Sequence, residues 1–184
     1  MRIASAAAAT ISLALAVHAS ERAPSWGDAQ LRRIHERLVA DVPTWSRALD
    51  NGPLTLIHND FNPRNIVARE SDGELSLCAF DWELATIGLP QRDLAELLCF
   101  VLPENESPAI VARWIERYRL LLEREAGRSL HRGEWDYGFK AALCDLLVDR
   151  LASYAMVDRI RRQKFLPRVI RGWLHLYRCY PWPG

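Results

Sequence analysis

The polar segment "LIHNDFNPRNIV", Leu56 to Val67, sits between apolar residues near the middle of the chain. A carboxylate at Asp60 could take the proton from a hydroxyl group that attacks a phosphoryl group. Side-chain oxygens at Asn65 and at Asp81, further along, are suitable ligands for Mg²⁺, which keeps several waters and needs few protein ligands. These residue types and this spacing predict a metal-assisted transfer reaction, in which positioning and charge neutralisation do most of the work.

A β-hairpin is predicted to bring Asp81 back to Asn65. Residues 54–58 read as a short buried extended run that enters the polar loop. Residues 65–69 and 75–82 can pair as two strands, with the turn sequence "ESDGE" between them. Because the ends of a hairpin lie side by side, Asp81 is expected beside Asn65. His58 is expected to hydrogen-bond within the loop and not to touch substrate.

Helical periodicity accounts for most of the remaining chain. Helices are predicted over 25–42, 44–50, 91–102, 108–128, 133–160 and 166–180. The predicted fold class is therefore α+β and mostly helical, with one small hairpin that carries the catalytic and metal loops. The chain is predicted to form one domain over 1–184. This domain comprises leading helices (1–50), the loop and hairpin (54–83) and a helical subdomain (91–180).

The order His58-x-Asp60-x4-Asn65, followed by "FDWE" from Phe80 to Glu83, resembles the aminoglycoside phosphotransferase and choline kinase superfamily. Its members have a kinase-like fold. An aspartate and an asparagine around a turn are, by themselves, more often turn chemistry than catalysis. The full set of residues, in order and on the expected elements, favours the resemblance.

The resemblance implies a role for each matching residue. Asp60 would be the catalytic base, and Asn65 and Asp81 would bind magnesium. His58 would be structural, as would Asp93 in "LPQRDLAELLCF", whose position typically braces the catalytic loop. Glu83 is a further candidate metal ligand, with a surface or helix-capping role as the alternative.

Only the C-terminal lobe of a kinase-like fold is matched, and the N-terminal lobe is expected to be absent. Nothing before His58 reads as a glycine-rich turn between strands, and the only lysines are Lys140 and Lys164. In kinases the missing lobe covers the nucleotide and supplies a lysine to its phosphates. A separate N-terminal lobe or a dimer partner is therefore expected, and without it an apolar surface would be exposed.

Residues 3–19 have two interpretations. Their similarity to a helix of the same superfamily predicts a core helix and a cytoplasmic protein. The basic start, apolar middle and Val17-His18-Ala19 cleavage signal are typical of a secretory signal peptide, which would make the protein secreted. The unbroken apolar run is too short for a membrane span, so no membrane span is expected.

An acceptor site is predicted at the start of helix 133–160. There, Trp135, Asp136 and Tyr137 form an aromatic and acidic cluster of a kind that holds a cationic group. The alternative is that the aromatic residues belong to the core, since aromatic side chains at helical spacing usually do.

Composition narrows the function further. The formal net charge of +1 argues against a nucleic-acid partner. The four cysteines include no CxxC pair, which argues against a zinc site. We therefore predict an ATP- and Mg²⁺-dependent phosphotransferase (a kinase) that acts on a hydroxyl group of a small molecule. The alternative is a catalytically inactive kinase-like lobe that acts as a binding module or persists as a gene fragment.

Overall fold

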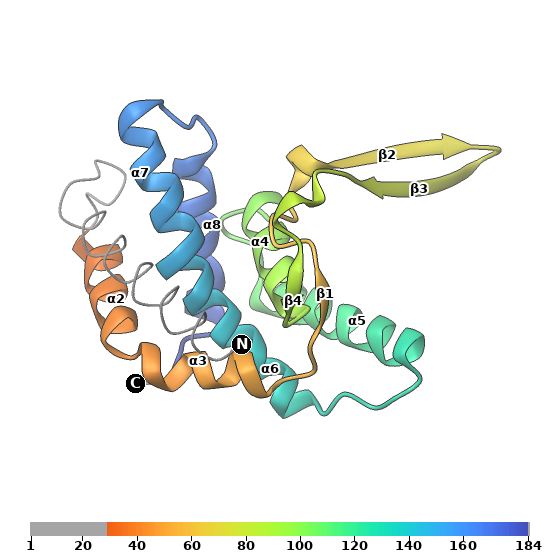
Figure 1. Ribbon diagram of the computed structural model, residues 1–184, viewed down its shortest axis with the longest axis horizontal. Coiled ribbons are helices and arrows are strands. Elements are labelled where there is room, and N and C mark those ends of the chain that lie inside the picture. The colour runs from red at the N-terminus through yellow and green to blue at the C-terminus, as the bar shows by residue number, and fades with distance from the viewer. Residues whose placement is uncertain (1–28, 184) are drawn as a thin grey trace.

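Helices make up most of the structure, a computed structural model that describes residues 29–183 (Figure 1). They are α2 (Ala29–Ala40), α3 (Val42–Asn51), α4 (Gln91–Val101), α5 (Pro108–Ala126), α6 (Arg132–Asp145), α7 (Ala152–Ile160) and α8 (Leu166–Cys179). A π-helical segment, η4 (Leu146–Leu151), joins α6 to α7 without a break. These bounds confirm the helices predicted from residue 91 onward. The helix or signal peptide predicted over 3–19 lies outside the described residues.

The core is built mainly between α4, α6 and α8. Trp135 and Phe139 of α6 and Trp173 of α8 are at most 2% exposed. The indole Nε1 of Trp173 donates to the carbonyl oxygen of Leu143 at 2.9 Å, so the buried donor is satisfied. Apolar burial of this kind stabilises by about 25 cal/mol per Å². The three packed helices therefore support the loops at their edge.

Two small antiparallel sheets lie on one side of these helices. The predicted hairpin is confirmed as β2 (Ile66–Ser71) paired with β3 (Glu74–Ala79), and it projects from the helices as an arm (Figure 1). Asp72 and Gly73 at its tip have φ of 54° and 77°. Positive φ at both central positions is typical of the two-residue turns that suit a hairpin twist.

The second sheet was not predicted. It pairs β1 (Thr55–Ile57) with β4 (Thr86–Gly88), which follows the short 3₁₀ turn η3 (Trp82–Leu84). A three-residue strand is too short to show an alternating pattern, so only its pairing with β1 identifies it. This pairing closes residues 58–85 into one unit that contains the polar loop and the hairpin.

Exposed apolar side chains gather on these β elements. The cross-strand partners Leu56 and Ile87 are 61% and 63% exposed, and Leu75 and Leu77 on the hairpin are 71% and 70% exposed. A large exposed apolar face usually marks a contact surface. Within the described residues, no helix is long and apolar enough to cross a membrane.

Candidate active site

Asp93, in the first turn of α4, holds the polar loop by its backbone. Its Oδ2 accepts the N–H of His58 at 2.7 Å, and its Oδ1 accepts the N–H of Asn59 at 2.8 Å. Asn59 has φ of 61°, a left-handed conformation that asparagine tolerates better than most residues. Asp93 thus contacts the loop at the place where the sequence predicts a brace.

The ring of His58 joins the loop to the end of β3. Its Nε2 lies 2.8 Å from the carbonyl oxygen of Phe80, and since a carbonyl only accepts, Nε2 must carry a proton. The ring is 1% exposed and lies 4.6 Å from the ring of Trp82, centroid to centroid. The His58 side chain is therefore buried and does not lie on a surface that substrate can reach.

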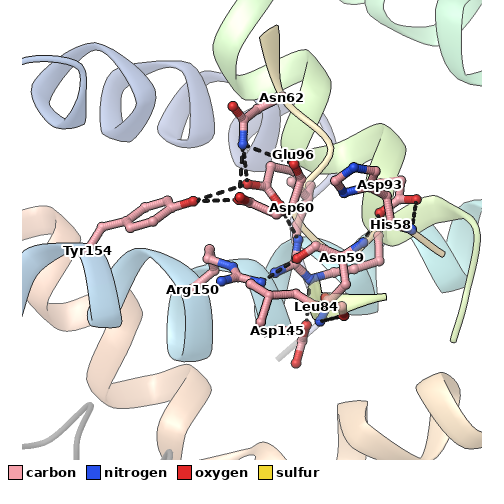
Figure 2. A network of polar contacts seen from close by, with 12 residues as sticks. His58, Asn59, Asp60, Asn62, Leu84, Asp93, Glu96, Asp145, Arg150 and Tyr154 are labelled. Carbon is pink, nitrogen blue, oxygen red and sulfur yellow. Dashed lines mark hydrogen bonds and ion pairs between the residues drawn. The ribbon is translucent and has the colours of Figure 1, made fainter. Parts of the chain in front are cut away.

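Asp60 lies at the centre of a network of donors (Figure 2). Its Oδ1 accepts the hydroxyl of Tyr154 at 2.8 Å and the Nδ2–H of Asn62 at 3.0 Å. Its Oδ2 accepts the Nδ2–H of Asn65 at 2.8 Å. The Asp60 carboxylate therefore has a defined orientation, held by residues from the loop itself and from α7.

The charge state of Asp60 follows from these contacts. Partial burial acts to raise the pKa of Asp60, but the hydrogen bonds from Tyr154 and Asn65 and the positive charge of Arg150 outweigh it. The net result is a lowered pKa. Asp60 is thus held as a carboxylate at neutral pH, which is the form that can accept a proton.

Asn65 and Asp81 lie at the same end of the hairpin. The backbone N–H of Phe80 donates to the carbonyl oxygen of Asn65 at 3.0 Å, so Asp81 is the next residue along from this pair. The amide nitrogen of Asn65 also donates to the backbone oxygen of Asp60 at 2.9 Å. With its nitrogen occupied on the Asp60 side, the amide oxygen of Asn65 is the atom left to serve as a ligand.

Asp81 is exposed and its conformation is unusual. Its φ is 65°, a left-handed value, and its side chain makes no capping hydrogen bond to η3. Glu83, two residues later in η3, is exposed as well. No group of three or more histidine, cysteine or acidic residues among those described could hold a metal ion by itself. An oxygen pair such as Asn65 and Asp81 suits Mg²⁺, which keeps waters and shares phosphate oxygens.

A buried ionic layer lies beneath the loop and was not predicted. Glu96, at 1% exposed, accepts Nδ2–H of Asn62 at 3.3 Å and pairs with Arg92 at 3.2 Å. Arg92 also pairs with Asp145 of α6 at 2.8 Å. Burial raises the pKa of Glu96, and the charges of Arg92 and Arg150 oppose this rise. The i,i+4 spacing of Arg92 and Glu96 was visible in the sequence, but it usually indicates an exposed pair.

Arginine side chains also reach the loop. Arg150 of η4 donates to the carbonyl oxygen of Asn59. Arg64 donates through Nη2 to the hydroxyl of Tyr154 at 3.1 Å, and its guanidinium carbon lies 4.3 Å from the centroid of the Phe165 ring. The π-helical segment that carries Arg150 is of a kind often found at functional sites.

The predicted acceptor cluster lies elsewhere. Trp135 is 2% exposed and belongs to the core, while Asp136 is within 3.9 Å of Arg132 on the same helix. Tyr137 is 43% exposed and lines a cavity of about 430 Å³. Tyr137 and Tyr154 stand at opposite ends of the continuous helix, so at 1.5 Å per residue roughly 25 Å separates them along its axis. The structure therefore does not bring this cluster to Asp60.

Comparison with known proteins adds one match. The model of a family described as the phosphotransferase enzyme family matches residues 6–133 of the chain. That range includes the polar loop, the hairpin, α4 and α5. No curated protein and no solved structure matches the chain.

Proposed function

The chain belongs to the phosphotransferase enzyme family, and on this premise we propose that it transfers the γ-phosphoryl group of ATP to a hydroxyl group of a small molecule. One observation carries the proposal. The amide nitrogen of Asn65 lies 2.8 Å from the carboxylate of Asp60, and the backbone pair between Asn65 and Phe80 brings the exposed residue Asp81 to the same end of the hairpin. A proton acceptor and two oxygen ligands in one place suit phosphoryl transfer.

Asp60 is the proposed general base. Its lowered pKa keeps it ionised, and donors on both of its oxygens hold its plane fixed. A carboxylate so held can orient an acceptor hydroxyl and take its proton as the oxygen–phosphorus bond forms. Asp93 and His58 keep the Asp60 backbone in place from either side, through the loop amides and through Phe80. Their contribution is to position Asp60 and not to touch substrate.

Asn65 and Asp81 are the proposed ligands of Mg²⁺, with Glu83 as a further candidate. The donor set fits, because the amide nitrogen of Asn65 is bound to Asp60 and its oxygen remains for a cation. Bound Mg²⁺ and ATP would supply the phosphoryl group and neutralise its charge. Asp81, exposed at the end of the hairpin, is accessible to both.

The apolar face of the β elements supports a proposal about partners. We assign the cross-strand pair Leu56 and Ile87 on one sheet, and Leu75 and Leu77 on the hairpin, to contacts with a nucleotide-covering lobe, in the same polypeptide or a separate one, or with a second copy. These side chains are 61% to 71% exposed, and several exposed apolar side chains on neighbouring strands are a usual mark of a contact surface.

The test is Mg²⁺-dependent binding of ATP to the purified chain, measured by calorimetry, with phosphate transfer followed by ³¹P NMR. GTP is compared as donor, and the acceptor panel contains amino-alcohols, aminoglycosides, neutral sugars and hydroxy acids. Three substitutions accompany the parent chain. Asp81→Asn removes a ligand, Asp60→Asn removes the base, and Asp72→Asn is the matched control.

Asp72 is a suitable control because it too has a left-handed φ, of 54°, but lies at the far tip of the hairpin. We expect Asp81→Asn to lose Mg²⁺-dependent binding and Asp72→Asn to retain it. Asp60→Asn should keep binding and lose turnover by roughly 10²- to 10⁴-fold, the usual contribution of a general base. Mg²⁺-dependent binding that survives unchanged in Asp81→Asn, or unchanged turnover in Asp60→Asn, would contradict the proposal.

A further inference from the structure

We propose that Tyr154 is a positioning residue for Asp60. Its hydroxyl occupies Oδ1 of the carboxylate, so that Oδ2, on the side of Asn65, is the oxygen left to accept the acceptor's proton. The inference rests on the proposed function and extends it to a residue 94 positions away in the sequence, on α7.

The hydrogen-bonding capacity of the carboxylate carries the argument. An ionised carboxylate has about four acceptor positions, two on each oxygen. Oδ1 of Asp60 is filled by Tyr154 at 2.8 Å and by Asn62 at 3.0 Å. Oδ2 has a single donor among the described residues, the Nδ2–H of Asn65 at 2.8 Å. The remaining position therefore lies on Oδ2, beside the proposed metal ligands.

The orientation of the phenol is set by its neighbours (Figure 2). Arg64 donates to the Tyr154 oxygen at 3.1 Å, so the phenol must direct its own proton elsewhere. Two carboxylates are within reach: Asp60 Oδ1 at 2.8 Å and Glu96 Oε1 at 3.4 Å. The shorter contact makes Asp60 the acceptor. Burial raises the pKa of Tyr154, so the phenol remains a donor at neutral pH.

Tyr154 is itself fixed by ring contacts. Its ring meets that of Phe165 edge-on at 5.3 Å, and the Arg64 guanidinium lies 5.5 Å from its centroid. These contacts depend on the ring and not on the hydroxyl. Tyr154→Phe therefore removes the two hydrogen bonds of the hydroxyl, to Asp60 and from Arg64, and leaves the ring packing, which separates positioning from structural support.

Besides the Tyr154 hydroxyl, three charged groups face Asp60. Arg64 lies 3.9 Å from Oδ1, Arg150 approaches from η4, and Glu96 lies behind Asn62. All three remain in Tyr154→Phe. No charged group is added or removed, so a change in the titration of Asp60 reports the loss of the phenol hydroxyl, including its hydrogen bond from Arg64.

The experiment titrates the Asp60 carboxyl carbon by ¹³C NMR in the full chain, without nucleotide or acceptor. We expect the pKa of Asp60 to rise in Tyr154→Phe, because hydrogen bonds to the ionised form favour that form. Tyr177→Phe is the matched control: it removes a buried phenol that bonds Arg37, far from the loop, and should leave Asp60 unchanged. An Asp60 pKa that does not move in Tyr154→Phe would overturn the inference.

Kinetics supply the second readout. In Tyr154→Phe we expect kcat to fall on the order of tenfold, the acid limb of the pH–rate profile to move to higher pH, and the acceptor KM to change little. An acceptor KM that rises while kcat and the acid limb stay in place would contradict positioning. Because the titration needs no turnover, an inactive parent chain would count against the proposed function alone.

A second variant covers the case in which Tyr154→Phe does not fold. Incorporating 3-fluorotyrosine at position 154 keeps the ring and the hydroxyl but makes the phenol a stronger donor. The pKa of Asp60 should then fall below that of the parent chain. No difference between the two would overturn the inference as well.

Discussion

The two oxygens of Asp93 accept the backbone N–H groups of His58 and its neighbour, at 2.7 and 2.8 Å, across 35 residues of sequence. One side chain thereby fixes the path of the loop two residues before Asp60. No other contact among those described replaces both hydrogen bonds. We therefore expect the loop conformation to depend on the Asp93 carboxylate.

Asp93→Asn should weaken the loop more than the fold. The amide that replaces the carboxylate has one acceptor oxygen and would point its N–H₂ group at a backbone donor. Losing charge-assisted hydrogen bonds of this kind costs about 1.5–3 kcal/mol. Urea unfolding should show that loss, and amide exchange at His58 and Asn59 should accelerate.

The control for that change is Asp50→Asn, at the exposed end of α3. The chemical change is the same, but Asp50 does not hold the polar loop. The substitution should therefore change the free energy of unfolding little. Equal losses in the two variants would show that Asp93 does not brace the loop.

Arg92→Met should be strongly destabilising. Arg92 is 4% exposed and is the ion-pair partner of both Glu96 and Asp145. Removing one member leaves buried negative charge uncompensated, which typically costs about 3–5 kcal/mol. Thermal and urea unfolding measure the loss. Arg171→Met, which breaks the exposed pair with Glu104, should have little effect.

Gly172→Ala should destabilise the contact between α4 and α8. A Cβ at Gly172 would lie 2.4 Å from the carbonyl oxygen of Cys99, a backbone atom that cannot move away alone. Overpacking of this kind costs about 1–3 kcal/mol. Gly133→Ala in α6 is the matched control, since its Cβ would lie 3.4 Å from the His131 side chain. The control should be neutral or stabilising, because alanine favours a helix over glycine.

Lowering the pH should decrease the free energy of unfolding in part because Asp60 becomes protonated. Its folded pKa is lowered, so the unfolded chain takes up this proton at higher pH than the folded one. The contribution of Asp60 is present above its unfolded pKa and is lost as pH falls through the folded pKa. The advantage of the parent chain over Asp60→Asn in free energy of unfolding should therefore shrink on acidification. A difference that is constant with pH would show that the Asp60 pKa is not shifted.

Much of the molecule could be predicted from the sequence because the signals are local. The helices from Gln91 onward follow from apolar periodicity, and the β2–β3 hairpin from alternating residues around Asp72 and Gly73. The order of His58, Asp60, Asn65 and Asp93 was enough to predict that these residues belong to one loop region, and the contacts of Asp93 with the loop and of Asn65 with Asp60 agree with that. Asp60 and Asn65 are close in both sequence and space, whereas Asp93 was placed by resemblance because it reaches the loop across 35 residues.

The rest depends on packing between distant segments, which no local pattern records. β4 exists because Thr86–Gly88 pairs with β1, and Trp135 is buried because α6 packs against its neighbouring helices, α4 among them. The tertiary structure alone places Tyr154 on Asp60 and buries Arg92 with Glu96 and Asp145. The sequence by itself determined which groups are available for phosphoryl transfer. Only the fold decided which oxygen of Asp60 accepts a second donor, because the Tyr154 hydroxyl reaches Oδ1 from a helix 94 residues away.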